Sequence, residues 1–377
     1  MTIDDLMAAA RGRPSGFDYM RLTLSVLVLL IHSVQIAYGH RVYMDAVWAH
    51  FPIDGLAMTV LPMFFTLSGF LVAGSLYRCR TLLSFMGLRF IRIYPALAVE
   101  VTISAVLVGG LVTNLSWPEY FTSDQFFRYL LNVTGHVSNA SLYLPGVFEA
   151  NPEPGMANGQ LWTVPYELIC YIGLGVLALA GARKDRRVLL AGLTIFIAFS
   201  VLKMGLRTGW QFDPWVGPVT GRALVIAFLL GICLHAYRDR VQIHGYLVMI
   251  AALVGVIGFS VSGLGQYIGL VAMAYVTVGL GVMDPPRLGV LKSADLSYGI
   301  FLYHFIIQQL IAHLLPGMRE WYWIAAFSLP LTMLVAHLSW VGIERPALKL
   351  RQHVFALECR IMRSLPGMSA WHASAER

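Results

Sequence analysis

The chain has 377 residues, of which 58% are hydrophobic and 12% charged, and its mean hydropathy is +0.68. Soluble domains carry about 25% charged residues, so this composition excludes a soluble single-domain enzyme, a disordered chain and a disulfide scaffold. The four cysteines are far apart and form no CxxC or other metal-ligand spacing. The net charge of +7 is then best explained by basic loops that orient a membrane protein.

Apolar stretches long enough to cross a bilayer recur along the chain, since a transmembrane helix needs about 20 such residues. We predict ten spans, at about 17–38, 54–77, 93–113, 160–181, 188–205, 219–237, 245–262, 264–282, 295–314 and 322–343. Asp4 and Asp5 precede the first span, which argues against a cleavable signal peptide. The prediction is an all-α integral membrane protein in which residues 1–377 form one membrane domain.

The basic residues predict the orientation of these spans. With ten spans, 21 of the 27 lysines and arginines fall on the side that holds both termini, including the basic tail at about 344–377. Cytoplasmic loops carry this excess, so both termini are expected in the cytoplasm. The basic residues are spread over six segments instead of one patch, which disfavours a nucleic-acid partner.

The longest predicted external loop, at about 114–159, is acidic and aromatic. It contains Glu119, Asp124, Trp117 and Tyr143, among other polar and aromatic residues. Such a surface can stack on sugar rings and bind their hydroxyls. An ordinary covering loop with interfacial aromatics is the equal alternative.

Charged residues inside membrane spans are costly and usually functional, and the first span contains two ionisable groups on one face. Arg21 and His32 are eleven residues apart, which places them within about 20° of each other and about 16 Å apart along a helix. The helix thus carries a cation near the cytoplasm and an imidazole toward the outer half. A lone membrane histidine is otherwise usually a packing residue.

The fourth predicted span supplies a carboxylate at a comparable depth. Glu167 lies about 10 Å below the outer end of that span, so it is a candidate partner that orients His32, as the acid of a hydrolase triad does. His32 would then act as a general base on a hydroxyl. A salt bridge that only holds the bundle together is the alternative.

A cytoplasmic arginine pair comes before the third span. Arg89 and Arg92 are i, i+3 neighbours, so both can face one anion, and guanidinium groups suit phosphates. Ordinary positive-inside flanking explains most such arginines. In the ninth span, Tyr303 and His304 either line the same cavity or are hydrogen-bonded within the bundle.

In order along the chain, these pieces resemble the integral-membrane acyltransferase 3 family, whose members O-acylate surface polysaccharides and other extracytoplasmic acceptors. The resemblance covers about 14–350. Its motifs are FDYMR at 17–21 followed by His32, FFTLSGF at 64–70, RFIRIYP at 89–95, LWTVPYE at 161–167, LSYGIFLYH at 296–304 and ERP at 344–346.

The resemblance implies a stand-alone, multi-pass O-acyltransferase of the bacterial inner membrane. The donor would be acetyl-CoA, the acceptor a polysaccharide or lipid-linked glycan such as exopolysaccharide or O-antigen, and no metal would be needed. It implies that His32 is catalytic with Glu167 as its partner, and that Arg21, Arg89 and Arg92 bind the donor. The candidates for lining the substrate pocket are Asp18, Ser68, Trp162, Tyr166, Tyr303 and His304.

A mechanism follows from these expectations. The arginines hold the donor's phosphates, and an extended pantetheine arm of on the order of 15–20 Å matches the rise from Arg21 to His32. His32 then acts as the base or carries the acyl group transiently. The alternative function is a multi-pass transporter in which Arg21, His32 and Glu167 form a proton relay. The oligomeric state is left open.

Overall fold

The computed structural model is all-helical and describes residues 1–49, 53–79, 81–134, 140–208, 219–261, 264–289 and 294–364. Over these residues no strand forms, and two isolated β-bridges join Thr2 to Gln242 and Tyr143 to Met156. The predicted all-α fold is therefore confirmed.

Each predicted span contains a helix. In chain order these helices are α2 (Gly16–Ala49), α3 (Ile53–Arg78), α4 (Leu82–Thr102) with the π-helix η1 (Ile103–Gly109), α8 (Val164–Leu177) between η3 (Gly159–Thr163) and η4 (Ala178–Ala182), α9 (Arg187–Thr208), α10 (Gly221–Ala236), α11 (Gly245–Val261), α12 (Gly265–Gly281), α14 (Ser297–Leu314) and α15 (Trp321–Ser339). Most of their side chains are apolar, which favours helices buried in lipid or in the bundle.

Six segments are long and apolar enough to cross a membrane: Gly16–His40, Gly55–Arg78, Leu82–Val112, Gly159–Ala182, Arg187–Leu206 and Trp321–Arg360. Helices α10, α11 and α12 are apolar but shorter. The finding supports a multi-pass membrane protein with six candidate spans among the described residues. The full count of ten and the cytoplasmic position of the termini stay predictions.

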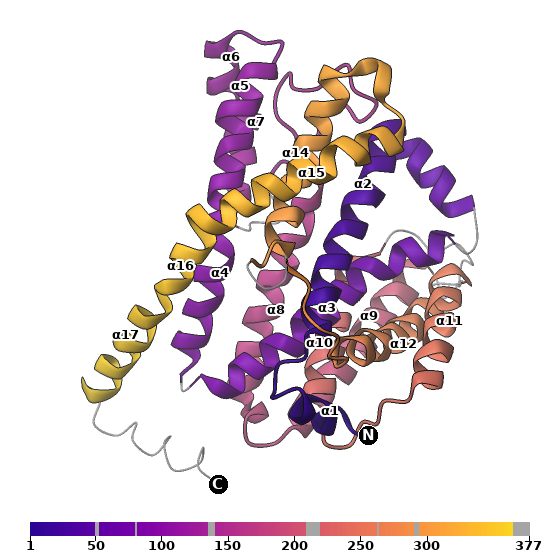
Figure 1. Cartoon of the computed structure of the whole chain (residues 1–377), viewed down its shortest axis with the longest axis vertical. Helices are drawn as coiled ribbons and strands as arrows, with labels where there is room; N and C mark the ends of the chain where they lie inside the picture. Colours follow the sequence, from indigo (N-terminus) through magenta and orange to yellow (C-terminus); the bar gives the residue numbers. More distant parts are fainter. Residues whose placement is uncertain are drawn as a thin grey trace.

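The short helices lie at the two ends of the molecule. Helices α5 (Gly110–Val112), α6 (Trp117–Thr122) and α7 (Asp124–Leu130) lie at one end, and α1 (Ile3–Ala9) lies at the other (Figure 1). Helices α15, η6 (Trp340–Glu344), α16 (Arg345–Lys349) and α17 (Arg351–Ser364) continue obliquely toward the end that holds α1 (Figure 1). The predicted external loop and the two terminal helices therefore lie at opposite ends.

Helices α3 and α10 cross at very close range because glycine stands at both contact points. A Cβ atom at Gly69 would overlap the carbonyl oxygen of Phe228, and one at Gly231 would overlap the carbonyl oxygen of Thr66. Small residues let membrane helices approach to backbone contact. This reciprocal contact fixes α3, which carries one wall of the site described below.

We expect Gly69→Ala to lower the thermal unfolding midpoint of the detergent-solubilised protein, because the added methyl group has only backbone to displace. Overpacking of this kind costs about 1–3 kcal/mol. The matched control is Gly173→Ala in α8, where a Cβ meets nothing within 4 Å and alanine should be neutral or stabilising. Equal midpoints for the two variants would contradict the close crossing.

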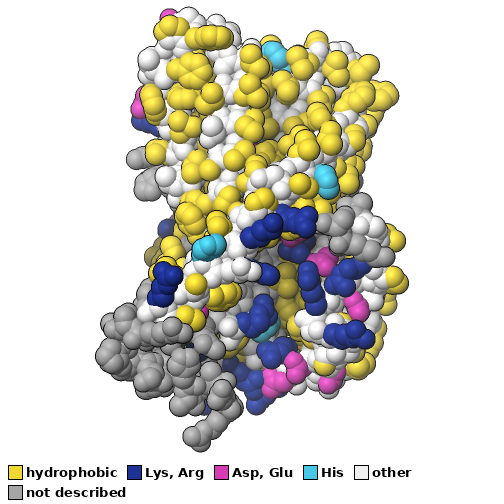
Figure 2. Space-filling model, turned by 60° about the vertical axis from the view of Figure 1, so that its left-hand side comes forward, with side chains coloured by type: hydrophobic (Ala, Val, Ile, Leu, Met, Phe, Trp, Pro, Cys, Tyr) yellow, Lys and Arg dark blue, Asp and Glu magenta, His cyan; other side chains and the backbone are white. Residues whose placement is uncertain are grey.

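The outer surface is apolar over much of its area. Figure 2 shows hydrophobic side chains over the upper part of one face and lysines and arginines gathered around a recess below. Exposed apolar residues include Leu111 (74% exposed) on α5, Met249 (70%) on α11 and Ile195 (69%) on α9. A continuous apolar surface of this kind suits contact with lipid rather than water.

Candidate active site

The centre of the candidate site is a pair of histidines from α2 and α14. Nδ1 of His32 lies 2.8 Å from Nε2 of His304, and the two rings stack with centroids 5.0 Å apart. His304 is fully buried, whereas His32 is partly exposed. The structure thus gives His32 a hydrogen-bonded partner, and that partner is another histidine.

The surroundings of His304 determine which nitrogen of each ring carries a proton. Nδ1 of His304 lies 3.0 Å from the carbonyl oxygen of Ile300 and 2.9 Å from that of Phe301. Carbonyl oxygens only accept, so this Nδ1 is the protonated nitrogen, and Nε2 of a neutral His304 accepts. His32 must then donate from its Nδ1. Its Nε2 is left with a free lone pair, which is the form a general base requires.

The sequence analysis predicted that Glu167 orients His32. In the structure His304, and not Glu167, makes the hydrogen bond to His32. Glu167 accepts a hydrogen bond from the hydroxyl of Tyr171, and the contacts of His32 found in the described part of the chain do not include it. Helix α8 packs against α10, α9 and α4, whereas α2 packs against α14. Equal depth in the membrane did not place the two helices side by side.

Two of the predicted phosphate-binding arginines are paired with carboxylates. Arg21 contacts Asp18 at 2.8 Å and Asp295 at 3.0 Å. Arg92 contacts the same Asp295 at 2.8 Å and Glu344 at 3.3 Å. This network, which joins α2, α4, η6 and the segment just before α14, neutralises both cations. Asp18, expected to line the substrate pocket, is part of it.

Arg89 differs from its neighbour. Its Nη2 donates to Oγ of Ser75 at 3.1 Å, and its guanidinium carbon lies 5.9 Å from the ring centres of Phe85 and Tyr171. Its buried Nε has no hydrogen-bond partner. Among the residues that the structure describes, no carboxylate forms an ion pair with Arg89. Of the three predicted arginines it is therefore the one that no carboxylate contacts directly among the described residues.

An enclosed cavity of about 140 Å³ connects these features. Its wall includes Ser68, Arg89, Arg92, Glu167, Tyr298 and Phe301. Phe301 also contacts the His304 ring, with 6.4 Å between centroids, and its carbonyl accepts from that histidine. The cavity wall thus includes both Arg89 and Phe301, and neither histidine of the pair is part of it.

The remaining predicted pocket residues lie outside this cavity wall. Tyr303 donates to Oγ of Ser339 at 3.2 Å and so faces α15. Trp162 and Tyr166 pack edge to face with centroids 5.8 Å apart, and the Tyr166 ring occupies the space beside Gly221. Of the predicted lining residues, Ser68 is the one in the wall.

Sequence reasoning missed two residues that hold the site together. Asp295 joins Arg21 to Arg92. Gln308, one helical turn beyond His304, donates to the Leu29 carbonyl at 2.9 Å and to Oγ of Ser33 at 2.7 Å. The i, i+4 spacing of two polar residues in an apolar helix was a signal that one face of α14 meets polar groups.

Comparison with known proteins identifies the class of enzyme. Residues 15–341 match the sequence model of an acyltransferase domain family. The chain belongs to the acyltransferase 3 family. It is therefore an acyltransferase, and the resemblance drawn from the sequence motifs is confirmed. Over the described residues, no group of three or more His, Cys, Asp or Glu side chains is placed to hold a metal ion.

Two curated relatives align over almost the whole acyltransferase. An O-acetyl transferase of Shigella phage Sf6 is 25% identical over 87% of this chain and 94% of its own length. Nodulation protein 10 of Rhizobium leguminosarum bv. viciae is 27% identical over 92% of this chain and 96% of its own length. No solved structure matches the chain.

Proposed function

We propose that this acyltransferase is an inner-membrane O-acetyltransferase. It moves an acetyl group from cytoplasmic acetyl-CoA to a hydroxyl of an extracytoplasmic or lipid-linked polysaccharide. The observation that carries the proposal is the histidine pair, in which His304 leaves His32 with a free Nε2. The phage relative is an O-acetyl transferase, which supports acetyl as the transferred group and oxygen as the atom that receives it.

The chemical step is a transfer between a thioester and an alcohol. Nε2 of His32 takes the proton of the acceptor hydroxyl as its oxygen attacks the thioester carbonyl. The carbon–sulfur bond then breaks, and the thiolate of coenzyme A leaves with the proton from His32. Transient acetylation of His32 is the second form of the same transfer. His304 supports either form because it holds the ring orientation.

The donor enters from the end that holds α1, and the acceptor from the opposite end. The enclosed cavity beside Arg89 suits the pantetheine arm. Arg21 and Arg92, which share Asp295 as an ion-pair partner, hold the wall of that cavity in place. At the other end, the loop that carries α6 and α7 presents Trp117 with 67% of its side chain exposed, which suits stacking on a sugar ring.

The test is mass spectrometry of cell-surface glycans from cells with and without this protein. We expect acetyl groups to be absent from one glycan when the protein is removed and to return when it is restored. The rival function, a transporter with a proton relay, predicts substrate flux that does not depend on acyl-CoA. Unchanged glycan acetylation together with such flux would contradict the proposal.

A further inference from the structure

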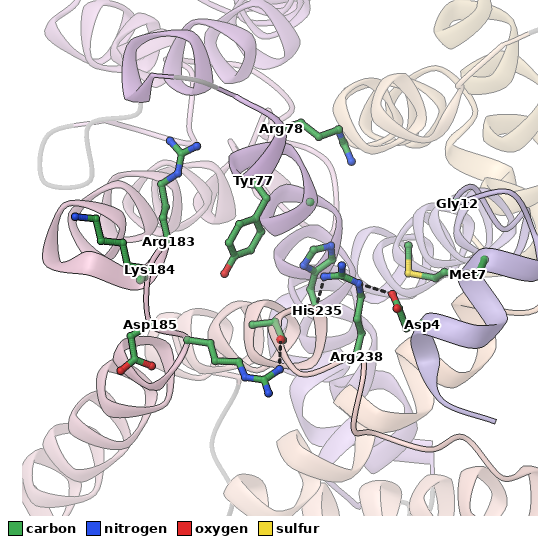
Figure 3. A pocket seen from close by; sticks show the side chains of 15 residues that line it. Asp4, Met7, Gly12, Tyr77, Arg78, Arg183, Lys184, Asp185, His235 and Arg238 are labelled. Atoms are coloured by element: carbon green, nitrogen blue, oxygen red, sulfur yellow. Dashed lines mark hydrogen bonds and ion pairs between the residues drawn. The ribbon is translucent and has the colours of Figure 1, made fainter. Parts of the chain in front are cut away.

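A second cavity, of about 840 Å³, opens at the end of the molecule that holds α1. Its wall comes from α1, the last turn of α3, the turn between η4 and α9, and the end of α10 (Figure 3). Neither histidine of the candidate active site lines it. The cavity is therefore separate from the histidine pair.

The wall of this basic cavity is rich in cations. It carries two carboxylates, Asp4 and Asp185. The cationic side chains of the wall are Arg78, Arg183, Lys184, Arg186 and Arg238. Figure 3 shows four of these cations, Arg78, Arg183, Lys184 and Arg238, lying around the cavity. Five cations against two carboxylates make an attractive site for a multiply charged anion.

Some of these cations already have partners, which sharpens the choice of residues to test. Arg238 contacts Asp4 at 2.7 Å, and Arg186 contacts Asp239 at 2.6 Å. The hydrogen bond from Arg186 lowers the pKa of Asp239, so that pair is ionic. Arg78 and Lys184 are exposed and form no ion pair that the described residues show. Their charge is available to a ligand.

The basic cavity also offers an aromatic surface. The ring of Tyr77 stacks on His235, with centroids 5.9 Å apart and planes 14° apart. His235 is 7% exposed, and its buried Nδ1 has no hydrogen-bond partner. Aromatic rings next to arginines bind nucleotides, because the base stacks while the guanidinium groups contact phosphates.

Helix α3 lines both the basic cavity and the enclosed cavity. Leu71 lines the enclosed cavity, whereas Gly74 and Arg78 line the basic one. Their i, i+3, i+7 spacing puts the three on one helix face. Between them, Ser75 accepts the hydrogen bond from Arg89. From Gly74 to Leu61, the far wall residue on α3, the helix rises about 20 Å, which an extended pantetheine arm can follow.

We propose that the basic cavity binds the nucleotide end of the acyl donor, an adenosine that carries a 3′-phosphate and a 5′-diphosphate. The inference rests on the proposed function, since it names the site where that donor is held. Arg21 and Arg92 are neutralised by carboxylates, so most of the phosphate charge needs other partners. Arg89 then stands at the passage between the nucleotide and the pantetheine arm.

Binding measurements on the full-length protein in detergent test this assignment. The probes are acetyl-CoA, adenosine 3′,5′-bisphosphate and the acetyl thioester of pantetheine, which lacks the nucleotide and all phosphates. We expect Arg78→Gln and Lys184→Gln each to weaken acetyl-CoA and the bisphosphate about tenfold, as loss of a charge-assisted phosphate contact does. The pantetheine thioester should bind all variants alike. Arg187→Gln, an exposed cation beside this cavity but outside its wall, is the matched control.

The possible outcomes separate this assignment from the proposed function. If the wild-type protein binds acetyl-CoA and both variants bind it with the same affinity, the nucleotide site is refuted and the proposed transfer reaction is not. If the variants lose affinity for the bisphosphate but keep their affinity for acetyl-CoA, the nucleotide site is also refuted, because the cavity then binds an unrelated anion. Competition by phosphatidylglycerol vesicles, but not by acetyl-CoA, would assign the cations to lipid headgroups instead. Failure of wild-type protein to bind acetyl-CoA would overturn both proposals.

Discussion

Replacing His32 by alanine is expected to abolish acetyl transfer while the protein still inserts and folds. The substitution removes the nitrogen that takes the acceptor proton, and general-base catalysis of this kind contributes about 10²–10⁴-fold to a rate. The alternative role as a transient acyl carrier predicts at least the same loss. The measurement is the rate of acetyl transfer from labelled acetyl-CoA to surface glycan in membranes that contain equal amounts of each variant.

The control for this variant is His337→Ala on α15, a histidine whose side chain is exposed and away from the histidine pair. It should leave the rate unchanged. Acetyl-CoA binding should survive in His32→Ala, since the proposed donor contacts lie on α3, on α4 and in the turn between η4 and α9. Retained acetylation of the glycan in this variant would refute the assigned role of His32.

The sequence was a reliable guide to helices, and it singled out His32, whose catalytic role stays a prediction. Spans are long apolar runs, and the bilayer admits few other structures, so all ten predicted segments contain a helix. His32 and Arg21 stood out because an apolar helix carries charged groups only where they are needed. The apolar length of a helix and the charged residues on its face can both be determined from the sequence of that helix alone.

Contacts between helices were harder to predict. Glu167 and His32 matched in depth, but depth does not state which helices are neighbours or how each is rotated. The structure places α14 against α2, so His304 takes the position expected for Glu167. Likewise, Arg89 and Arg92 looked equivalent in the sequence. The structure shows that Arg92 is neutralised by Asp295, which lies about 200 residues away in the chain.

The role of His304 leads to the second large expected effect. Phenylalanine at position 304 keeps a ring of similar size and removes the acceptor for the N–H of His32. His32 can then place its proton on either nitrogen, and the catalytic form is no longer enforced. We expect His304→Phe to lower kcat about 100-fold, with little change in the KM for acetyl-CoA.

A second substitution at the same position separates orientation from packing. Glutamine has an amide oxygen that can accept from His32 and an NH₂ group that can donate to the carbonyl of Ile300. His304→Gln should therefore keep kcat within about tenfold of the wild-type rate. The control on the same helix is His313→Phe, which packs against Phe148 and should leave kcat unchanged.

The comparison of these variants decides what the histidine pair does. If His304 only fills space, phenylalanine should be tolerated better than glutamine, because a buried amide without partners is costly. If it fixes the tautomer of His32, the order is reversed, and the difference appears in kcat and not in the amount of folded protein. Equal activity of His304→Phe and wild type would show that Nε2 of His32 is directed by another group.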